Sequence, residues 1–182
     1  MHILKDNLEY SKKKIFSYLI IISLISFGLK LYTADFSSLP SEDTFGYVVR
    51  SISDNNGDFT EPPRKTLGWS LTISPFLRSI NSENFLDYLN IARGLSLSIS
   101  VISIVPLYLL ARRFFDEKYS LVAAFLFAIE PHLNYNAGGG YSEPLFILIM
   151  ILTSYFILKK DTKSMYVSST TINELGKLVA NC

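Results

Sequence analysis

The stretch GLSLSISVISIVPLYLLA (Gly94–Ala111) decides the fold of this chain, because its 18 residues carry no charge. Arg112 and Arg113 close the stretch immediately. A helix that crosses a bilayer needs about 20 predominantly apolar residues, with a range of ~17–25. This stretch meets that requirement without help from its neighbours, so the sequence predicts a membrane-spanning helix here.

Three further apolar stretches are of nearly spanning length: Ile15–Leu29, Tyr119–Ile129 and Pro144–Leu158. The first extends to Tyr32 if the Lys30 ammonium reaches the membrane surface along its apolar stem. Composition agrees, since 49% of residues are hydrophobic and only 18% are charged, against the usual quarter. We therefore expect an all-α, polytopic membrane protein with about four transmembrane helices, at about 15–32, 94–111, 119–135 and 144–158.

Basic clusters flank these stretches on alternate sides. They are Lys12–Lys14, Arg112–Arg113 with Lys118, and Lys159–Lys160 with Lys163. The positive-inside rule places all three clusters in the cytoplasm. Both termini are then cytoplasmic, whereas the long loop at about 34–90 and the short loop around 134–143 are extracytoplasmic. The long loop holds eight acidic and four basic residues. We expect a multi-pass protein of the cell membrane whose active face is extracytoplasmic.

The long outer loop contains signals for short helices. Ser41 or Asp43 can cap a helix through Thr44–Ile52. A turn cluster follows, in which Gly57 is free to adopt positive φ. The segment TLGWSLTISPFL (Thr66–Leu77) is too short to span and is predicted to be an interfacial or re-entrant helix.

Both ends of the chain leave alternatives open. A basic, then apolar N-terminus also fits a cleaved signal peptide, but no small-x-small pair follows the apolar run, so an uncleaved first helix is preferred. Residues 161–182 are polar and rich in Ser and Thr. They are either a short cytoplasmic tail or the result of truncation or frame disruption of a longer protein.

Several function classes are disfavoured. A net charge of +1 gives no global field for nucleic acid. The single cysteine, Cys182, supports no disulfide framework. The two histidines, His2 and His132, fall on opposite predicted sides and make no histidine-rich metal site. No cofactor is predicted; a divalent cation held by Asp43 and Glu143 is possible chemistry that the sequence does not indicate.

The candidate site residues converge on the predicted outer face: Glu42, Asp43, Arg64, Lys65, Arg93, Glu130, His132 and Glu143. Most have a structural alternative. Asp43 can serve as a helix cap, Arg93 can extend to the membrane surface, and Arg64 with Lys65 can bind lipid headgroups. His132 can pack or cap, and Glu143 suits a helix start before Pro144. Glu130 differs, because an acid near a span end is costly unless it pairs or reaches water.

The order of these features resembles the N-terminal part of GT-C superfamily glycosyltransferases. The resemblance covers about 12–160 and includes ARRFFDEKYSLVAAFLFAIEPH (Ala111–His132) and the following NYNAGGGYSEPLF. The closest group looks like the polyprenyl-phosphate-sugar-dependent protein O-mannosyltransferases and aminoarabinose transferases, in an archaeal version. That family carries about a dozen spans, so four correspond to its N-terminal portion.

The resemblance implies an inverting transfer of a hexose-type sugar from a polyprenyl- or dolichyl-phosphate donor, on the extracytoplasmic face. The acceptor is a protein, lipid or glycan, and the chain works in the lipid bilayer. By position, Asp43 matches the general base of the family and Glu42 is its neighbour, although the family commonly shows Asp-Glu where this chain has Glu-Asp. Arg64, Lys65 and Arg93 match the family's donor phosphate-binding residues.

Two other function classes remain. The chain could be a non-catalytic membrane subunit or truncated pseudo-enzyme. A small transporter is less favoured, because no inverted repeat and no symmetric pair of interrupted spans is visible.

Overall fold

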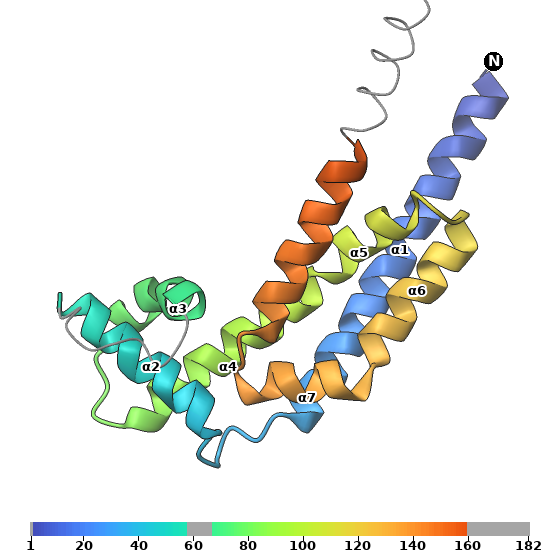
Figure 1. Cartoon of the computed structure of the whole chain (residues 1–182). Helices are drawn as coiled ribbons and strands as arrows, with labels where there is room; N and C mark the ends of the chain where they lie inside the picture. The colour runs from blue at the N-terminus through green and yellow to red at the C-terminus, as the bar shows by residue number, and fades with distance from the viewer. Residues whose placement is uncertain (1, 58–66, 160–182) are drawn as a thin grey trace, which may run out of the picture.

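The computed structural model describes residues 2–57 and 67–159, with side chains from residue 13 onward. Within this part the chain is helical and contains no strand (Figure 1), which confirms the predicted all-α class. The helices are α1 (His2–Thr33), α2 (Glu42–Asn55), α3 (Leu67–Arg78), α4 (Phe85–Ile102), α5 (Ile104–Ala111), α6 (Glu117–Ile129), α7 (Pro131–Gly139) and a last helix at residues 143–159. The predicted tail at 161–182 lies outside the described residues.

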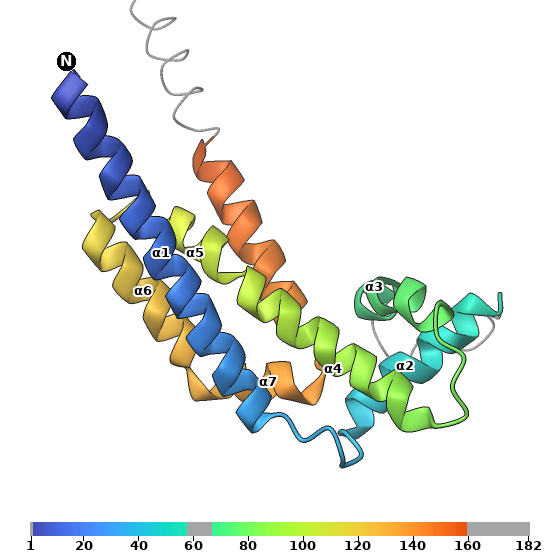
Figure 2. The ribbon, with the colours of Figure 1, turned by 180° about the vertical axis from the view of Figure 1, so that it is seen from behind.

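The long helices form an antiparallel bundle. α1 packs against α4, α6 and α7, and α5 packs against α6. The last helix runs beside α4 and α5, and the guanidinium of Arg113 lies 5.0 Å from the centre of its Tyr155 ring. Seen from either side, the α5–α6 turn lies at one end of the bundle, and α2, α3 and α7 lie at the other (Figures 1 and 2). The bundle therefore has two chemically different ends.

Two helical segments of the described chain are long and apolar enough to cross a membrane: Lys13–Thr33, with 21 residues, and Phe85–Ala111, with 27. Only 22% and 33% of their most apolar windows are buried, so most of this apolar surface faces outward. α6 has 13 residues, and the described part of the last helix covers residues 143–159, so both are shorter than these two segments. Lys13–Thr33 and Phe85–Ala111 support association with a membrane.

The second of these segments begins at Phe85, nine residues before the predicted boundary at Gly94. The prediction began after the charged Arg93, whereas the helix begins where Asn84 caps it by accepting a hydrogen bond from Leu86 N. Pro106 then interrupts the segment, because its ring clashes with the carbonyl of Ile102, four residues earlier. The segment stays close to helical through Ser103, which has φ −64° and ψ −18°.

The predicted third span, 119–135, is broken in the structure. Glu130 adopts φ −61° and ψ 120°, because a residue before proline is pushed to extended geometry. Its carboxylate then caps α7 by accepting from Leu133 N, and Pro131 takes the first helical position. The predicted boundary is therefore wrong: α6 ends at Ile129, and α7 runs across the end of the bundle (Figure 1).

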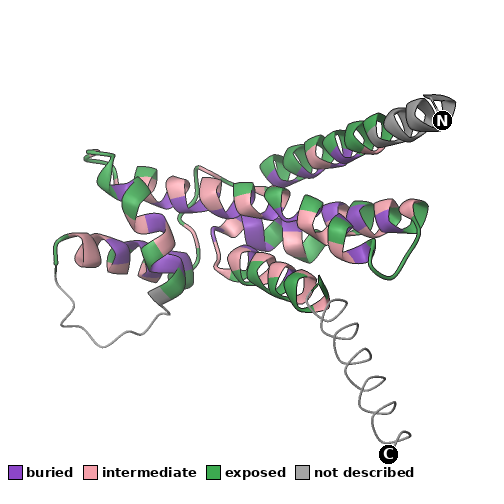
Figure 3. Cartoon of the chain, turned by 90° about the horizontal axis from the view of Figure 1, so that it is seen from above, coloured by how far each residue is buried: buried purple, intermediate pink, exposed green. Residues whose placement is uncertain are grey.

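Two hydrophobic clusters hold the molecule together. Figure 3 shows how the buried positions, in purple, are distributed along the helices. One joins α1, α5 and α6 through Leu19, Ile22, Ile104, Tyr108, Ala124 and Ala128. The other joins α2, α3 and α4 through Tyr47, Val48, Trp69, Ile73, Leu77, Leu89 and Ala92. The buried apolar residues of α3, Trp69, Ile73 and Leu77, recur every fourth position, which is one face of a helix. A helix thus exists where the interfacial or re-entrant helix was predicted, and its buried face packs on protein while Leu71 and Phe76 remain exposed.

Candidate functional site

The acid pair predicted as catalytic stands in the first turn of α2. Glu42 is the first residue of the helix and Asp43 the second, and both are exposed. Ser41 is the N-cap residue, with φ −58° and ψ 160°. Of the two predicted cap residues, Ser41 and Asp43, it is therefore Ser41 that takes this position. Carboxylates are favoured at this end of a helix by the backbone dipole. The two acids are therefore presented to solvent at the end of the bundle that holds α7.

The last residues of α7 and the turn that follows, here together called the glycine hub (Gly138–Ser142), contact Thr44, the residue after the acid pair. Its main chain and one hydroxyl are bound by side chains from three helices: Thr44 Oγ1 donates to Gly139 O at 2.8 Å, Trp69 Nε1 to Gly140 O at 3.1 Å, Ser96 Oγ to Tyr141 O at 3.0 Å, and Tyr47 Oη pairs with Ser142 Oγ at 3.2 Å. The hub thereby connects α2, α3 and α4 to the bundle.

Two hub glycines lie in close contact with neighbouring segments. Gly140 has φ +80°, in the left-handed region that only glycine adopts without strain. A Cβ there would lie 3.0 Å from Thr44 Cγ2 and 3.2 Å from the backbone nitrogen of Arg93. A Cβ on Gly138 would lie 3.1 Å from Ala34 Cα. The absence of side chains is what allows α2, α4 and the end of α1 to approach the hub.

The loop between α1 and α2 is attached to α4 by two polar side chains. Arg93 Nη2 donates to Ser38 O at 2.9 Å, and Asn90 Nδ2 donates to Phe36 O at 3.1 Å. Arg93 Nη1 also donates to Asn90 Oδ1 at 2.9 Å, so the two residues support each other. Only 3% of Arg93 is exposed. The predicted donor phosphate-binding Arg93 is thus buried, with both terminal nitrogens bound to the protein.

The same loop contains an acid that the prediction did not consider. Asp35 accepts hydrogen bonds from Ser37 Oγ at 2.6 Å and from the Ser37 amide at 3.0 Å. The Ser37 hydroxyl first, then the Ser37 amide and Ser38, lower the pKa of Asp35 to about 2. A carboxylate held so firmly in its charged form is a weak proton acceptor. Asp35 therefore stabilises the turn, and it is a poor rival to the acid pair as a base.

Lys30 does not reach the membrane surface, as the sequence suggested it could. Its side chain is fully buried, and its Nζ donates to Ser26 Oγ at 2.7 Å and to Asn134 Oδ1 at 2.6 Å. Asn134 lies on α7, so the contact joins the end of α1 to the crossing helix. The expectation was wrong because α7 supplies a buried acceptor, which satisfies the ammonium inside the protein.

The remaining predicted residues lie on segments other than α2 or outside the described part of the chain. The Glu130 carboxylate caps α7. His132 and Glu143 are exposed on the surface, at the first turns of α7 and of the last helix. Arg64 and Lys65 lie outside the described residues. In the described part of the chain, no group of three or more His, Cys, Asp or Glu residues could hold a metal ion.

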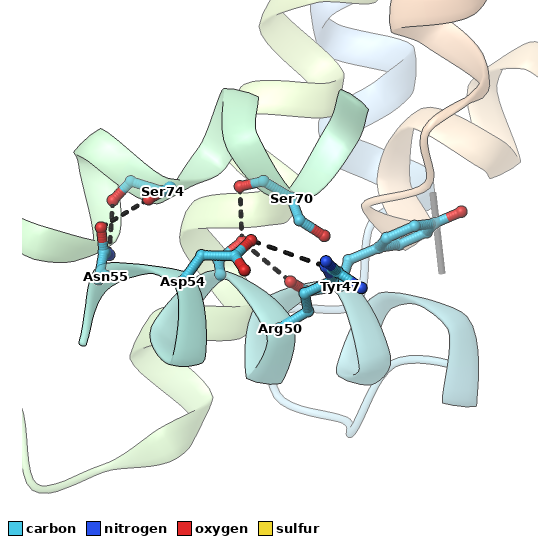
Figure 4. A network of polar contacts seen from close by, with 7 residues as sticks. Tyr47, Arg50, Asp54, Asn55, Ser70 and Ser74 are labelled. Carbon is cyan, nitrogen blue, oxygen red and sulfur yellow. Dashed lines mark hydrogen bonds and ion pairs between the residues drawn. The ribbon is translucent and has the colours of Figure 1, made fainter. Parts of the chain in front are cut away.

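Sequence reasoning missed a polar seam between α2 and α3 (Figure 4). Ser51 Oγ donates to Ser70 O at 2.7 Å, and Asn55 and Ser74 exchange two hydrogen bonds of 3.0 and 2.6 Å. The Nε atom of Arg50 lies 3.7 Å from Oδ2 of Asp54, and both side chains are largely buried. The polar positions 47, 51 and 54 of α2 follow helical spacing, which was the available signal.

One small pocket lies between α4, α7 and the last helix. It is lined among others by Ser100, Ser103, Asn136 and Glu143. Its volume of about 10 Å³ is close to the smallest that holds one water molecule. It is therefore too small for a sugar ring.

The Trp69 indole gives a stability prediction. Trp69 is 1% exposed, and Trp69→Phe keeps an aromatic ring while leaving the carbonyl of Gly140 without its donor. We expect a loss of about 1–3 kcal/mol in the free energy of unfolding, which is the cost of an unsatisfied buried acceptor. Denaturant titration in detergent, followed by circular dichroism, measures it. The exposed Phe76→Leu in the same helix is the control, and an equal loss in both variants would contradict the role of the hydrogen bond.

Comparison with protein-family models, with curated proteins and with solved structures finds no match to this chain.

Proposed function

We propose that this chain is a membrane glycosyltransferase region that transfers a hexose-type sugar from a polyprenyl-phosphate donor to an acceptor hydroxyl outside the cytoplasm. The observation that carries the proposal is the placement of Glu42 and Asp43. Both carboxylates are exposed in the first turn of a helix at one end of a largely apolar bundle. A donor whose lipid lies in the membrane presents its phosphate and sugar at such an end.

The proposed chemistry uses Asp43 as general base, with Glu42 beside it. The carboxylate accepts the proton of the acceptor hydroxyl while the oxygen of that hydroxyl bonds to the anomeric carbon of the sugar. The bond from that carbon to the phosphate oxygen breaks, and the lipid phosphate leaves with the electron pair. The configuration at the anomeric carbon inverts. Arg64 and Lys65 are the cations proposed to stabilise the phosphate.

Charge placement supports the proposed multi-pass topology. Arg112 and Arg113 lie in the α5–α6 turn, and the segments that carry Lys13, Lys14 and Lys159 point toward the same end of the bundle (Figure 1). The acid pair lies at the opposite end. This separation agrees with a basic cytoplasmic and an acidic outer side. The outward-facing apolar side chains of α1, such as Phe16, Leu24 and Leu31, suit contact with lipid.

Thiol labelling tests this topology. In a Cys182→Ser background, Ser41→Cys reports on the end with the acid pair and Phe115→Cys on the α5–α6 turn. Both positions are exposed. We expect a membrane-impermeant maleimide to label Ser41→Cys in intact cells and Phe115→Cys only after permeabilisation. Equal labelling of both from outside would overturn the proposed topology.

The transfer itself is tested on the full chain in membrane vesicles. A polyprenyl phosphate carrying a radiolabelled hexose is supplied with a panel of peptide, lipid and glycan acceptors. We expect label to move to an acceptor with inversion at the anomeric carbon, and only when the donor sugar is linked to a lipid phosphate. Transfer from a free nucleotide sugar, or no transfer from any lipid-linked donor, would count against the proposal.

A second function is that of a non-catalytic membrane subunit. The exposed apolar side chains of the described helices suit contact with another membrane protein as well as with lipid. Purification in mild detergent distinguishes the two functions. A subunit is expected to leave the membrane in a stoichiometric complex with another membrane protein and to have no transfer activity by itself.

A further inference from the structure

We infer that Thr44 and Arg93 are positioning residues that hold the acid pair of α2 between two attachments to the rest of the fold. The inference rests on the proposed function for its catalytic consequence. The attachments themselves are geometric and are tested separately. Neither residue contacts the acceptor in this inference; each acts through the main chain that carries the carboxylates.

The upstream attachment fixes the chain before the acid pair. The Arg93 guanidinium binds the carbonyl of Ser38, four residues before Glu42, and Asn90 binds the carbonyl of Phe36. The two donors are three positions apart on α4, so they lie on one face of that helix. Because Arg93 is 3% exposed, water competes little for its hydrogen bond.

The downstream attachment fixes the chain directly after the acid pair. Thr44 follows Asp43, is fully buried, and donates to Gly139 O at 2.8 Å. The two attachments are close to each other, because Gly140 lies against both Thr44 and Arg93. The acid pair thus lies between an attachment to α4 and an attachment to the glycine hub, while its carboxylates remain exposed.

This arrangement matters because exposed carboxylates on a loosely held loop would sample many orientations. A base must lie within hydrogen-bond reach of the proton that it accepts. A misplacement of about 1 Å can cost roughly 100-fold in rate. The buried attachments therefore provide the precision that the exposed position of the acids does not.

A nitroxide label on Ser41→Cys, in the Cys182→Ser background of the full chain, tests the attachment. Thr44→Val keeps the shape of the side chain and removes the donor, whereas Thr44→Ser keeps the donor. We expect Thr44→Val to increase the mobility of the label, and Thr44→Ser to restore the parent spectrum. Ser96→Ala removes a different hub hydrogen bond and is the matched control, which is expected to leave the label unchanged.

In the transfer assay, Thr44→Val is expected to lower kcat roughly 10–100-fold with KM unchanged, and Thr44→Ser to recover it. Arg93→Met is likewise expected to increase the mobility of the label and to lower kcat. An unchanged spectrum in Thr44→Val overturns the positioning inference, whatever the activity. Absence of transfer by the parent chain overturns the proposed function instead, and the spectra still decide whether the attachments hold the acid pair.

Discussion

Asp43→Asn is expected to lower sugar transfer by about 10²–10⁴-fold, the usual contribution of a general base. Asparagine keeps the size of the side chain and its hydrogen-bonding capacity, but it does not accept the acceptor's proton at neutral pH. The residue is exposed in the first turn of α2, so the substitution leaves the packing of the helix intact. Transfer from the radiolabelled lipid-linked donor measures the loss, and detergent extraction with circular dichroism checks insertion and fold.

Two control variants sharpen this result. Glu83→Gln removes an exposed acid from the α3–α4 loop, and it is expected to leave transfer unchanged. Glu42→Gln decides which member of the pair is the base, because the base is the one whose amide variant loses more activity. Transfer by Asp43→Asn at the parent rate would exclude Asp43 as the base. Loss in Glu42→Gln alone would transfer the role to its neighbour.

The second large effect is on stability. Asn134→Leu is expected to lower the free energy of unfolding by about 3 kcal/mol, because it removes a partner from the buried ammonium of Lys30. The remaining partner on α1, Ser26, satisfies only one of the three ammonium hydrogens. Reversible unfolding in mixed micelles measures the loss. A decrease well under 1 kcal/mol would show that the contact contributes little.

A double variant separates the hydrogen bond from simple packing. Lys30→Met with Asn134→Leu replaces both polar partners by apolar groups of similar size, which is often close to neutral. We expect the double variant to be more stable than Asn134→Leu alone. If instead the two losses add, the two side chains are independent and α1 is held to α7 by other contacts.

The fold could be predicted where apolar runs and turn residues act locally. The helix over Leu67–Arg78 and the positive φ of Gly57, at 76°, both follow from short-range signals. The start of α4 could not be found in this way, because the prediction treated Arg93 as the end of the loop. The cost of a charge in an apolar helix depends on its partners, and one partner of Arg93, the carbonyl of Ser38, lies 55 positions away.

The position of the acid pair was predictable from the sequence, whereas the contacts of the segment that carries it were not. The exposed acid pair was found from its place before an apolar helix. The role of the glycines was only partly visible, because three consecutive glycines predict a tight turn but do not identify what approaches it. Thr44, Trp69 and Ser96 look unremarkable in sequence, and only the fold shows that they bind the same turn. Lys30 was placed wrongly for the same reason, since its acceptor lies 104 positions away.

The glycine hub also constrains the order in which the molecule can be completed. Its hydrogen bonds join residues that are 45, 71 and 95 positions apart in the chain. Such contacts form only after the later segment exists, and the long loops that they close slow their formation. As a ribosome releases the chain from its N-terminus, α2 and α3 emerge well before the hub that binds them. α2, α3 and α4 can pack on one another earlier, but the hydrogen bonds that fix the helix bearing the acid pair to the hub form only after the turn that follows α7 has been translated.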